Sequence, residues 1–342
     1  MVEDARAQIE AQVHRGWFMR QVRRLAFGML QSRAALTFVG TLLYLYEASR
    51  MKALVRALGF LHLLGRLGDL EQLAPSAEPP FFFSQVGRTF PPIGPQRHRV
   101  ALLAGCIANV AFARLNEATV RVLQQNGCEV TIPKDQGCCG ALHVHSGLPE
   151  DARKLARRNI DSVLAGGFDA VITNAAGCGS TLKEYGELLE GDSQYAAKAH
   201  QFSSLMRDVT EFLASLELNP RMGSVDASVT YQDSCHLAHW QRIRTAPRKL
   251  LAAVPGLTFT EMPGADICCG SAGIYNLVQN EMSTALLGTK MESVNSTRAT
   301  IIATANPGCM LQLQAGVRLH GSGQSVMHVV EILDLAYARA RG

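Results

Sequence analysis

Eight of the nine cysteines in this 342-residue chain form two sets with the same spacing. Each set has a single cysteine, then an adjacent pair followed by glycine, then a last single cysteine. The first set is Cys106, Cys138, Cys139 and Cys178, and the second is Cys235, Cys268, Cys269 and Cys309. Corresponding cysteines are 129 (Cys106 to Cys235) to 131 (Cys178 to Cys309) residues apart. Because chance does not keep eight positions in step, the pattern predicts two copies of one structural unit.

Four thiolates per unit are typical ligands of a soft metal ion or an iron–sulfur cluster, so all eight cysteines are predicted cofactor and metal ligands. The glycines after the pairs, Gly140 and Gly270, let the backbone approach a bound group closely. Adjacent cysteines suit a structural disulfide poorly, because that bridge is strained. Four thiolates complete a 4Fe-4S cluster or a tetrahedral zinc site equally well, so both cofactors stay open on the residues alone.

The segments between the cysteines predict the same order of elements in both units. The first unit has apolar, strand-like runs at 100–104, 129–132 and 170–173 and helical stretches at 111–125 and 149–165; the second has strands at 229–232, 258–262 and 300–304 and helices at 237–253 and 279–293. Strands that alternate with helices indicate an α/β fold with mainly parallel sheets. Every cysteine then follows a strand, at the sheet edge where such folds bind ligands. Two such edges facing each other would form a buried site region with pseudo-two-fold symmetry.

The predicted organisation is therefore two tandem related α/β units preceded by a helical segment. The predicted boundaries are a helical N-terminal segment at 1–72, a proline-rich linker at 73–98, a first cysteine-rich domain at 99–220 and a second at 221–342. Six prolines between residues 73 and 95 exclude a regular helix, and Phe81, Phe82 and Phe83 are expected to pin this extended connector to a neighbouring surface.

Composition narrows the classes of function. A net charge of +4 without an arginine-rich run argues against nucleic acid as a partner. Residues 1–66 hold ten Lys or Arg against four Asp or Glu, so this end can rest on an anionic membrane surface or a partner subunit, or can simply be the solvated face of packing helices. The apolar stretch 34–46 is too short to span a bilayer, which takes about 20 residues. With no secretory signal pattern, we expect a cytoplasmic location, at most peripheral on the inner face of the membrane.

Other polar side chains near the cysteines are weaker candidates. Cys128 lies outside both sets and is expected to be a small buried apolar residue. Four histidines could supply ligands or donors near the cysteines, although polar loop histidines are the simpler interpretation and His236 is the best candidate; they are His143, His145, His236 and His239. Tyr185 and Tyr275 are expected to lie in the core or at its rim. Lys183 and Glu184 are expected on the surface of a helix. No P-loop, nucleophile-elbow, zinc-protease or dinucleotide-binding motif occurs, so independent hydride or hydrolytic chemistry is not expected.

The doubled motif resembles the cysteine-rich CCG domain of heterodisulfide reductase subunits and related iron–sulfur oxidoreductases. Within that superfamily, about residues 95–340 are similar to the iron–sulfur subunit of bacterial glycolate oxidase. The stretches that carry the likeness are 137–141, 177–179 with 183–186, 268–275 and 304–309. The resemblance implies 4Fe-4S clusters and a partner flavin-containing subunit that oxidises glycolate to glyoxylate, with electrons passed on toward quinone.

Two departures from the family pattern leave alternatives open. The family normally carries an amino-terminal ferredoxin-like domain, but no cysteine precedes Cys106, so that domain is expected to be absent from this chain. Many members end each motif with Cys-x2-Cys, whereas Ala175 and Asn306 stand at the first of those positions here. The leading hypothesis is an electron-transfer subunit that is not catalytic alone. The alternatives are a thiol/disulfide oxidoreductase like heterodisulfide reductase and a zinc-stabilised assembly subunit.

Overall fold

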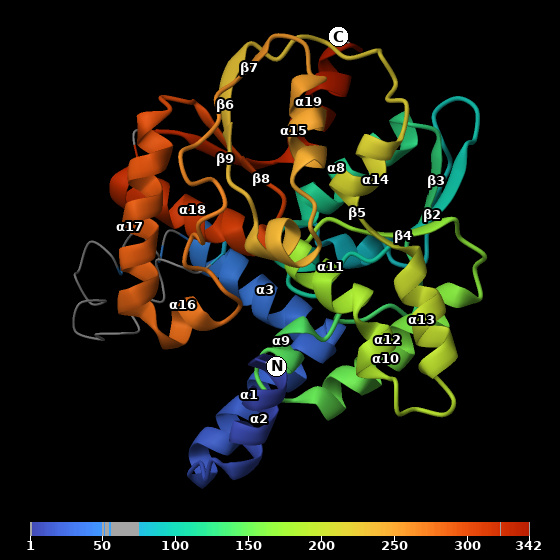
Figure 1. Ribbon diagram of the computed structural model, residues 1–342, viewed down its shortest axis with the longest axis vertical. Coiled ribbons are helices and arrows are strands. Elements are labelled where there is room, and N and C mark those ends of the chain that lie inside the picture. The colour runs from blue at the N-terminus through green and yellow to red at the C-terminus, as the bar shows by residue number, and fades with distance from the viewer. Residues whose placement is uncertain (1, 50, 52–54, 56–74, 322, 342) are drawn as a thin grey trace.

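Three helices open the chain, and two open sheets covered by helices follow (Figure 1). The computed structural model describes residues 2–49, 51, 55, 75–321 and 323–341. The opening helices are α1 (Val2–Gln12), α2 (Trp17–Gln31) and α3 (Arg33–Ala48). Ser32 ends α2 and caps α3, because its Oγ accepts the Ala35 N–H at 3.2 Å. The expected helical start is confirmed through Ala48, the end of α3, and most of the predicted segment beyond it lies outside the described residues.

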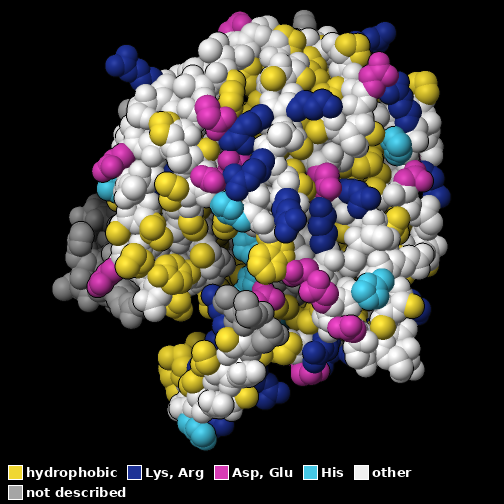
Figure 2. All heavy atoms as spheres, in the orientation of Figure 1, with side chains coloured by type: hydrophobic (Ala, Val, Ile, Leu, Met, Phe, Trp, Pro, Cys, Tyr) yellow, Lys and Arg dark blue, Asp and Glu magenta, His cyan; other side chains and the backbone are white. Residues whose placement is uncertain are grey.

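The opening helices cover part of the first unit and leave a broad apolar face exposed. Phe27, Leu30 and Leu36 are buried together with Val110 of the first unit. The opposite side exposes large hydrophobic residues of α2 and α3, namely Trp17, Phe18, Val22, Leu25, Phe38, Leu42 and Leu45. Figure 2 shows hydrophobic side chains over the part of these helices that projects from the body. Within the described ranges, no helix combines the length and hydropathy needed to cross a bilayer.

The first unit contains a five-stranded sheet in the order β1-β3-β2-β4-β5. Its strands are β1 (Thr89–Phe90), β2 (His98–Leu102), β3 (Cys128–Thr131), β4 (Ala170–Thr173) and β5 (Met206–Asp208). Its helices are η1 (Phe82–Gln85), α7 (Ala108–Ala111), α8 (Ala113–Gln125), α9 (Ala141–Val144), α10 (Pro149–Leu164), α11 (Ala176–Lys183), α12 (Tyr185–Leu188), α13 (Ala196–Leu205) and α14 (Val209–Ser215). All pairings are parallel except β1 with β3, and Val100 lies between Val130 and Ala170. The central strands are apolar on both faces, as strands covered by helices on two sides must be.

The second unit contains a four-stranded, fully parallel sheet in the order β7-β6-β8-β9. Its strands are β6 (Ala227–Tyr231), β7 (Leu257–Phe259), β8 (Ile301–Thr304) and β9 (Ser325–His328). Its helices are the π-helical turn η2 (His236–Trp240), α15 (Thr245–Ala252), α16 (Tyr275–Val278), α17 (Asn280–Ser296), α18 (Pro307–His320) and α19 (Val329–Arg339). Two tandem units with parallel-rich sheets confirm the predicted α/β class.

Several local expectations need correction. Each sheet has a further parallel strand, β5 and β9, that was not predicted, because short runs with polar residues give no apolar signal. The predicted linker is not wholly irregular: it contributes η1 and the edge strand β1, and Phe82 is buried in the first core. The predicted helix 237–253 is interrupted, since residues 241–244 separate η2 from α15. The domain division near residue 220 stays a prediction.

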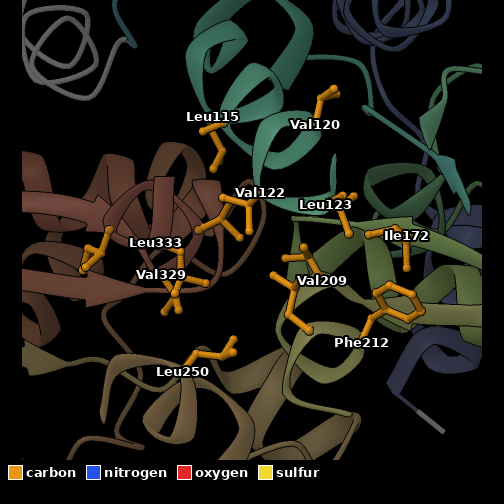
Figure 3. Packing of buried hydrophobic residues seen from close by; sticks show 14 of the residues in the cluster. Leu115, Val120, Val122, Leu123, Ile172, Val209, Phe212, Leu250, Val329 and Leu333 are labelled. Carbon is orange, nitrogen blue, oxygen red and sulfur yellow. The ribbon is translucent and has the colours of Figure 1, made fainter. Parts of the chain in front are cut away.

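One hydrophobic cluster draws side chains from both units. Helix α8, the first long helix of the first unit, packs on α19, the last helix of the second unit. In the same way α14, the last helix of the first unit, packs on α15, the first α-helix of the second. Figure 3 shows Val122 of α8 on the side of Val329 and Leu333 of α19, and Leu123 of α8 next to Ile172 of β4. Arg121 adds a two-pronged ion pair to Asp334 across the same boundary, with the shortest N–O distance 2.7 Å. The two sheets are therefore held together by a common core.

Candidate metal centres

The first four cysteines meet at the carboxyl edge of the first sheet. Cys106 lies between β2 and α7, the pair Cys138 and Cys139 is separated from α9 only by Gly140, and Cys178 is the third residue of α11. Cys106 and Cys139 lie within hydrogen-bonding reach of Cys138 and hold the pKa of its thiol well below the usual range. Contact with Cys138 raises the pKa of Cys106 and of Cys139, and Cys139 also reaches Cys178. The four thiols are thus neighbours in the order 106, 138, 139, 178.

The second set repeats this arrangement at the carboxyl edge of the second sheet. Cys235 precedes η2, Cys268 and Cys269 lie in the loop before α16, and Cys309 is the third residue of α18. Cys235 and then Cys269 lower the pKa of Cys268. Cys269 reaches Cys309 and lowers the pKa of that thiol too. The order of contacts, 235, 268, 269, 309, matches the first set member by member.

The glycine after each pair is required by the backbone and donates to sulfur. Gly140 and Gly270 have φ of +85° and +90°, a left-handed conformation that side chains with a Cβ disfavour. In this conformation the Gly140 N–H points to Cys138 Sγ at 3.5 Å, and the Gly270 N–H points to Cys268 Sγ at 3.3 Å. These donors stabilise a thiolate at the first cysteine of each pair.

This donor set fits an iron–sulfur cluster. Each unit supplies four sulfurs, an N–H aimed at one of them, and the first turn of a helix beside the last cysteine. Across the described ranges, no three His, Cys, Asp or Glu side chains are already arranged to hold one metal ion. The thiols contact one another in sequence instead, which suits a cluster in which each cysteine binds a different iron. That these eight cysteines bind a cofactor stays a prediction.

A buried amide and phenol hold the first cysteine pair in place. Asn159 of α10 accepts the Gly137 N–H at 2.8 Å and donates to the Cys138 carbonyl at 3.0 Å. Tyr185 donates to the Cys139 carbonyl at 2.8 Å and accepts from Asn159 at 3.0 Å. Tyr185 is a core tyrosine, as expected, and it positions the backbone of the pair rather than a sulfur.

His143 is not the polar loop residue expected from the sequence. It is fully buried in α9, and its ring lies 5.0 Å from the ring of Phe27 of α2. The Gln31 amide nitrogen donates to Nε2 at 3.1 Å, which leaves Nδ1 as the protonated ring nitrogen. Nδ1 has no hydrogen-bond partner in the described part of the chain, and the His143 side chain lowers the pKa of Cys138. His143 therefore belongs to the surroundings of the first site.

The cysteine edges of the two units face each other across α11, η2 and the start of α18. His236, next to Cys235, shares a 2.9 Å hydrogen bond with Ser180 of α11, and burial lowers the pKa of its imidazole. Gln241 donates to the Ala176 carbonyl at 3.0 Å. The Gly177 N–H, at the start of α11, donates to Asn306 Oδ1 at 3.3 Å. The two cysteine edges therefore lie against each other, and that they form one pseudo-two-fold site region stays a prediction.

Helix α1 and two acidic groups border this region. His145, just after α9, pairs with Glu3 of α1 at 2.8 Å, and its ring lies 5.2 Å from that of His236. Trp240 donates to Glu184 at 2.6 Å, and burial raises the pKa of this carboxyl to about 7. The expected surface position of Glu184 is therefore only partly right, because the residue is half-buried at the contact between the units.

The other candidates take structural roles. Cys128 is fully buried in β3, and burial raises its pKa to about 12, so it is the apolar residue that was expected. His239 is exposed and shares hydrogen bonds with the Asp266 carbonyl and Arg244. Lys183 forms an ion pair with Glu211 at 2.7 Å. Tyr275 is the half-buried first residue of α16.

Sequence reasoning missed two residues at the second site. Lys290 of α17 is buried, with Nζ 2.7 Å from the Gly264 carbonyl in the loop that leads to the cysteine pair. Asn306 was noted only as a missing cysteine, but its Nδ2 donates to Cys309 Sγ at 3.4 Å. The repeat itself could have identified both residues. Lys290 corresponds to Asn159 and Asn306 to Ala175, each 131 residues earlier, so the side chains at these two positions differ between otherwise matched sites.

A small pocket adjoins the first site where α2 and α3 meet the first unit. Its lining includes Cys106 and Cys138, together with Arg33 and Arg158. Asn109, also in the lining, is buried and its Oδ1 has no partner among the residues described. The pocket therefore has a mixed apolar and polar lining and places two arginines near two thiols.

Comparison with known proteins agrees with this arrangement. Residues 100–183 and 229–314 match the family "Cysteine-rich domain" (CCG), and residues 19–74 match "Glycolate oxidase iron-sulfur subunit, linker region". The chain is 38% identical to the probable glycolate oxidase iron-sulfur subunit of Bacillus subtilis, over 97% of this chain and 76% of that protein. It is 35% identical to the glycolate oxidase iron-sulfur subunit of Escherichia coli, over 75% and 65%. Lactate utilization protein A of Oceanobacillus iheyensis is 30% identical, over 69% and 96%. By these matches and by its two CCG units, the chain belongs to the family of the glycolate oxidase iron-sulfur subunits.

Proposed function

We propose that this chain is an iron–sulfur electron-transfer subunit of a flavin-dependent glycolate (2-hydroxy acid) dehydrogenase complex. Partner subunits that carry flavin would oxidise the acid, glycolate to glyoxylate, and this chain would pass the electrons toward quinone. The observation that carries the proposal is the gathering of eight cysteines into two matched groups of four at facing sheet edges. Because one relative is named for lactate utilization, the identity of the acid, glycolate, is itself part of the proposal.

In this proposal each domain, 99–220 and 221–342, holds one centre. When bound, an iron–sulfur cluster accepts and releases electrons one at a time. The protein's part is to place the thiolates, to donate N–H groups to them from Gly140 and Gly270, and to keep the loops rigid through groups such as Tyr185. The contact of α11 with the Asn306 side chain keeps the two sites next to each other.

The same chain has features that suit docking. The exposed hydrophobic face of α2 and α3 supports contact with a partner subunit, or with a membrane surface near the quinone pool. The flavin-containing subunits are the partners we propose for it.

The test is metal content after anaerobic purification and reconstitution. We expect iron and labile sulfide in the wild-type chain, loss of about half of both in Cys269→Ser, and full retention in Cys128→Ser, which is equally buried but outside the sets. A wild-type chain without iron and sulfide would refute the proposal. Equal losses in both variants would refute the assignment of ligands.

A thiol/disulfide reductase is the second candidate, supported by the pocket beside Cys106 and Cys138. It predicts that adding a small thiol changes the spectrum of the first centre, whereas the electron-transfer proposal predicts no change. A zinc-stabilised assembly subunit is the third, and it predicts a colourless protein with stoichiometric zinc.

A further inference from the structure

Lys290 places a positive charge inside the second unit. Its side chain is 2% exposed, and Nζ donates to the carbonyls of Gly264 at 2.7 Å and Ala265 at 3.5 Å. The ion pairs found among the described residues do not include it. A buried ammonium group without a carboxylate partner requires another source of negative charge nearby.

The thiolates of the second site are the main part of that source. Burial lowers the pKa of Lys290, whereas Cys269 and Cys268, and after them the carboxylates Asp266 and Asp233, favour its charged form. Lys290 in turn favours the thiolate at Cys268. The lysine therefore faces the site that would hold an anionic cluster, from the helix that packs behind the cysteine pair.

The first site has no such charge at the matching position. Asn159 stands 131 residues before Lys290, the same separation as between Cys178 and Cys309. Its neutral amide occupies the same side of the first cysteine pair and satisfies the Gly137 N–H and the Cys138 carbonyl. At this position of the helix the second unit therefore has a buried positive charge, and the first has a neutral amide.

A second difference also favours negative charge on the sulfurs of the second site. Asn306 donates from Nδ2 to Cys309 Sγ at 3.4 Å, whereas Ala175, 131 residues earlier, has only a methyl group to offer Cys178. The other end of the Asn306 amide accepts the Gly177 N–H at 3.3 Å, which fixes the direction of the donor.

Three groups at the first site could oppose these differences. His143 is buried there and its side chain lowers the pKa of Cys138, as Asn306 lowers that of Cys309 at the second site. The larger difference between the sites is therefore the buried charge of Lys290.

Arg33 and Arg158 lie near the first site, but Arg158 is exposed, and both donate to backbone carbonyls of the loop before the pair. Solvent screens such charges far more than it screens a buried ammonium. Solvent access does not separate the sites either, because each has two buried and two partly exposed cysteines.

We propose that Lys290 and Asn306 give the second centre a higher reduction potential than the first, so that an electron shared between them settles on the second. Net positive charge and hydrogen bonds to the sulfurs both stabilise the reduced, more negative state of a cluster. In the transfer step the first centre loses one electron and the second gains it, with no bond broken. The inference rests on the proposed function, in which a reduced flavin supplies the electron and a quinone-class acceptor removes it.

The experiment is a redox titration of the reconstituted full chain, followed by electron paramagnetic resonance. Cys139→Ala removes the first centre, so the signal that remains identifies the second. We expect this signal to belong to the higher of two midpoint potentials in the wild type. In Lys290→Asn, which copies the first unit, the oxidised-to-reduced ratio of the second centre at a fixed potential should rise about tenfold, equivalent to 59 mV for one electron.

Further variants keep the test decisive. Lys290→Arg, which retains the charge, and Lys154→Asn, which removes an exposed lysine of α10, should leave the second potential unchanged. Asn306→Ala should lower it in the same direction as Lys290→Asn, and it provides the measurement if Lys290→Asn fails to hold iron. A second centre with the lower potential in the wild type, or an unchanged potential in iron-loaded Lys290→Asn or Asn306→Ala, would overturn the inference. A wild-type chain without clusters would instead refute the proposed function.

Discussion

The glycines that follow the cysteine pairs should tolerate alanine very differently in the two units. Gly140 and Gly270 share a left-handed backbone, with φ of +85° and +90°. Adding a Cβ in that conformation costs about 1–2 kcal/mol, and this part of the penalty is the same at both positions. The difference comes from what the new methyl group would meet.

At Gly270 the methyl group has no room. Its Cβ would lie 2.5 Å from the Ser283 carbonyl oxygen, which belongs to the backbone of α17. At Gly140 the nearest atoms are the Cα and Cβ of Ala152 at 3.3 Å, which need to move only slightly. Overpacking of this kind typically adds about 1–3 kcal/mol, so we expect Gly270→Ala to cost about 3–4 kcal/mol and Gly140→Ala about 1–2 kcal/mol.

Urea unfolding of the three anaerobic proteins, wild type and both variants, measures these losses, and an iron assay accompanies it. Moving α17 also moves Lys290 and the second cysteine pair, so Gly270→Ala should lose iron from the second site while Gly140→Ala keeps most of its own. Gly288→Ala is the matched control on α17: among the described residues, no atom beyond the neighbouring residues and backbone of the helix itself lies within 4 Å of its Cβ, and it should stabilise the chain by up to about 1 kcal/mol. A Gly140→Ala variant as unstable as Gly270→Ala would refute the reasoning.

Two further predictions concern the common core and the caps beside it. Burial lowers the pKa of His328 to about 4 and raises that of Asp208 to about 6. As pH falls from 6.5 to about 4, His328 reduces the stability of the fold, because the unfolded state takes up its proton first. As pH falls from about 6 to 3.8, Asp208 increases the stability, because the folded state takes up its proton first. Urea unfolding across pH 4–7 should therefore show a steeper acid loss in Asp208→Asn and a reduced or reversed one in His328→Asn, and parallel profiles would contradict this assignment. Arg121→Met should lower the free energy of unfolding by about 1 kcal/mol at low salt and less at high salt, and a double-mutant cycle with Asp334→Asn should assign that loss to the ion pair.

The repeat in the cysteines made the fold and the site predictable because both depend on sequence-local signals. Strand β4 matches its predicted range 170–173, since four consecutive buried apolar or threonine residues leave a clear pattern. Strands β5 and β9 left none: Met206–Asp208 has three residues, two of them charged, and pairs only because β4 offers a parallel neighbour. Such strands are specified by the sheet rather than by their own residues.

The surroundings of the sites were harder to predict, because they depend on distant parts of the chain. His143 is buried by Phe27 and Gln31, which lie more than a hundred positions earlier in helix α2. Lys290 gives no local sign of burial, since a lysine within a helix normally faces solvent. Only the comparison of one unit with the other, residue by residue, shows that the second site has Lys290 and Asn306 where the first has Asn159 and Ala175.

The common core explains why such differences can matter. Helices α8 and α19 bury their apolar sides against each other, and α14 and α15 do the same. Each unit has a hydrophobic cluster of its own and shares a further one with the other unit. That reciprocal packing fixes the two cysteine edges in one orientation, with the Asn306 side chain linking them. Two copies with identical surroundings would hold an electron equally well, and transfer between them would have no preferred direction. A buried lysine and one asparagine, placed in only one of the copies, are enough to break that equality while the scaffold stays the same.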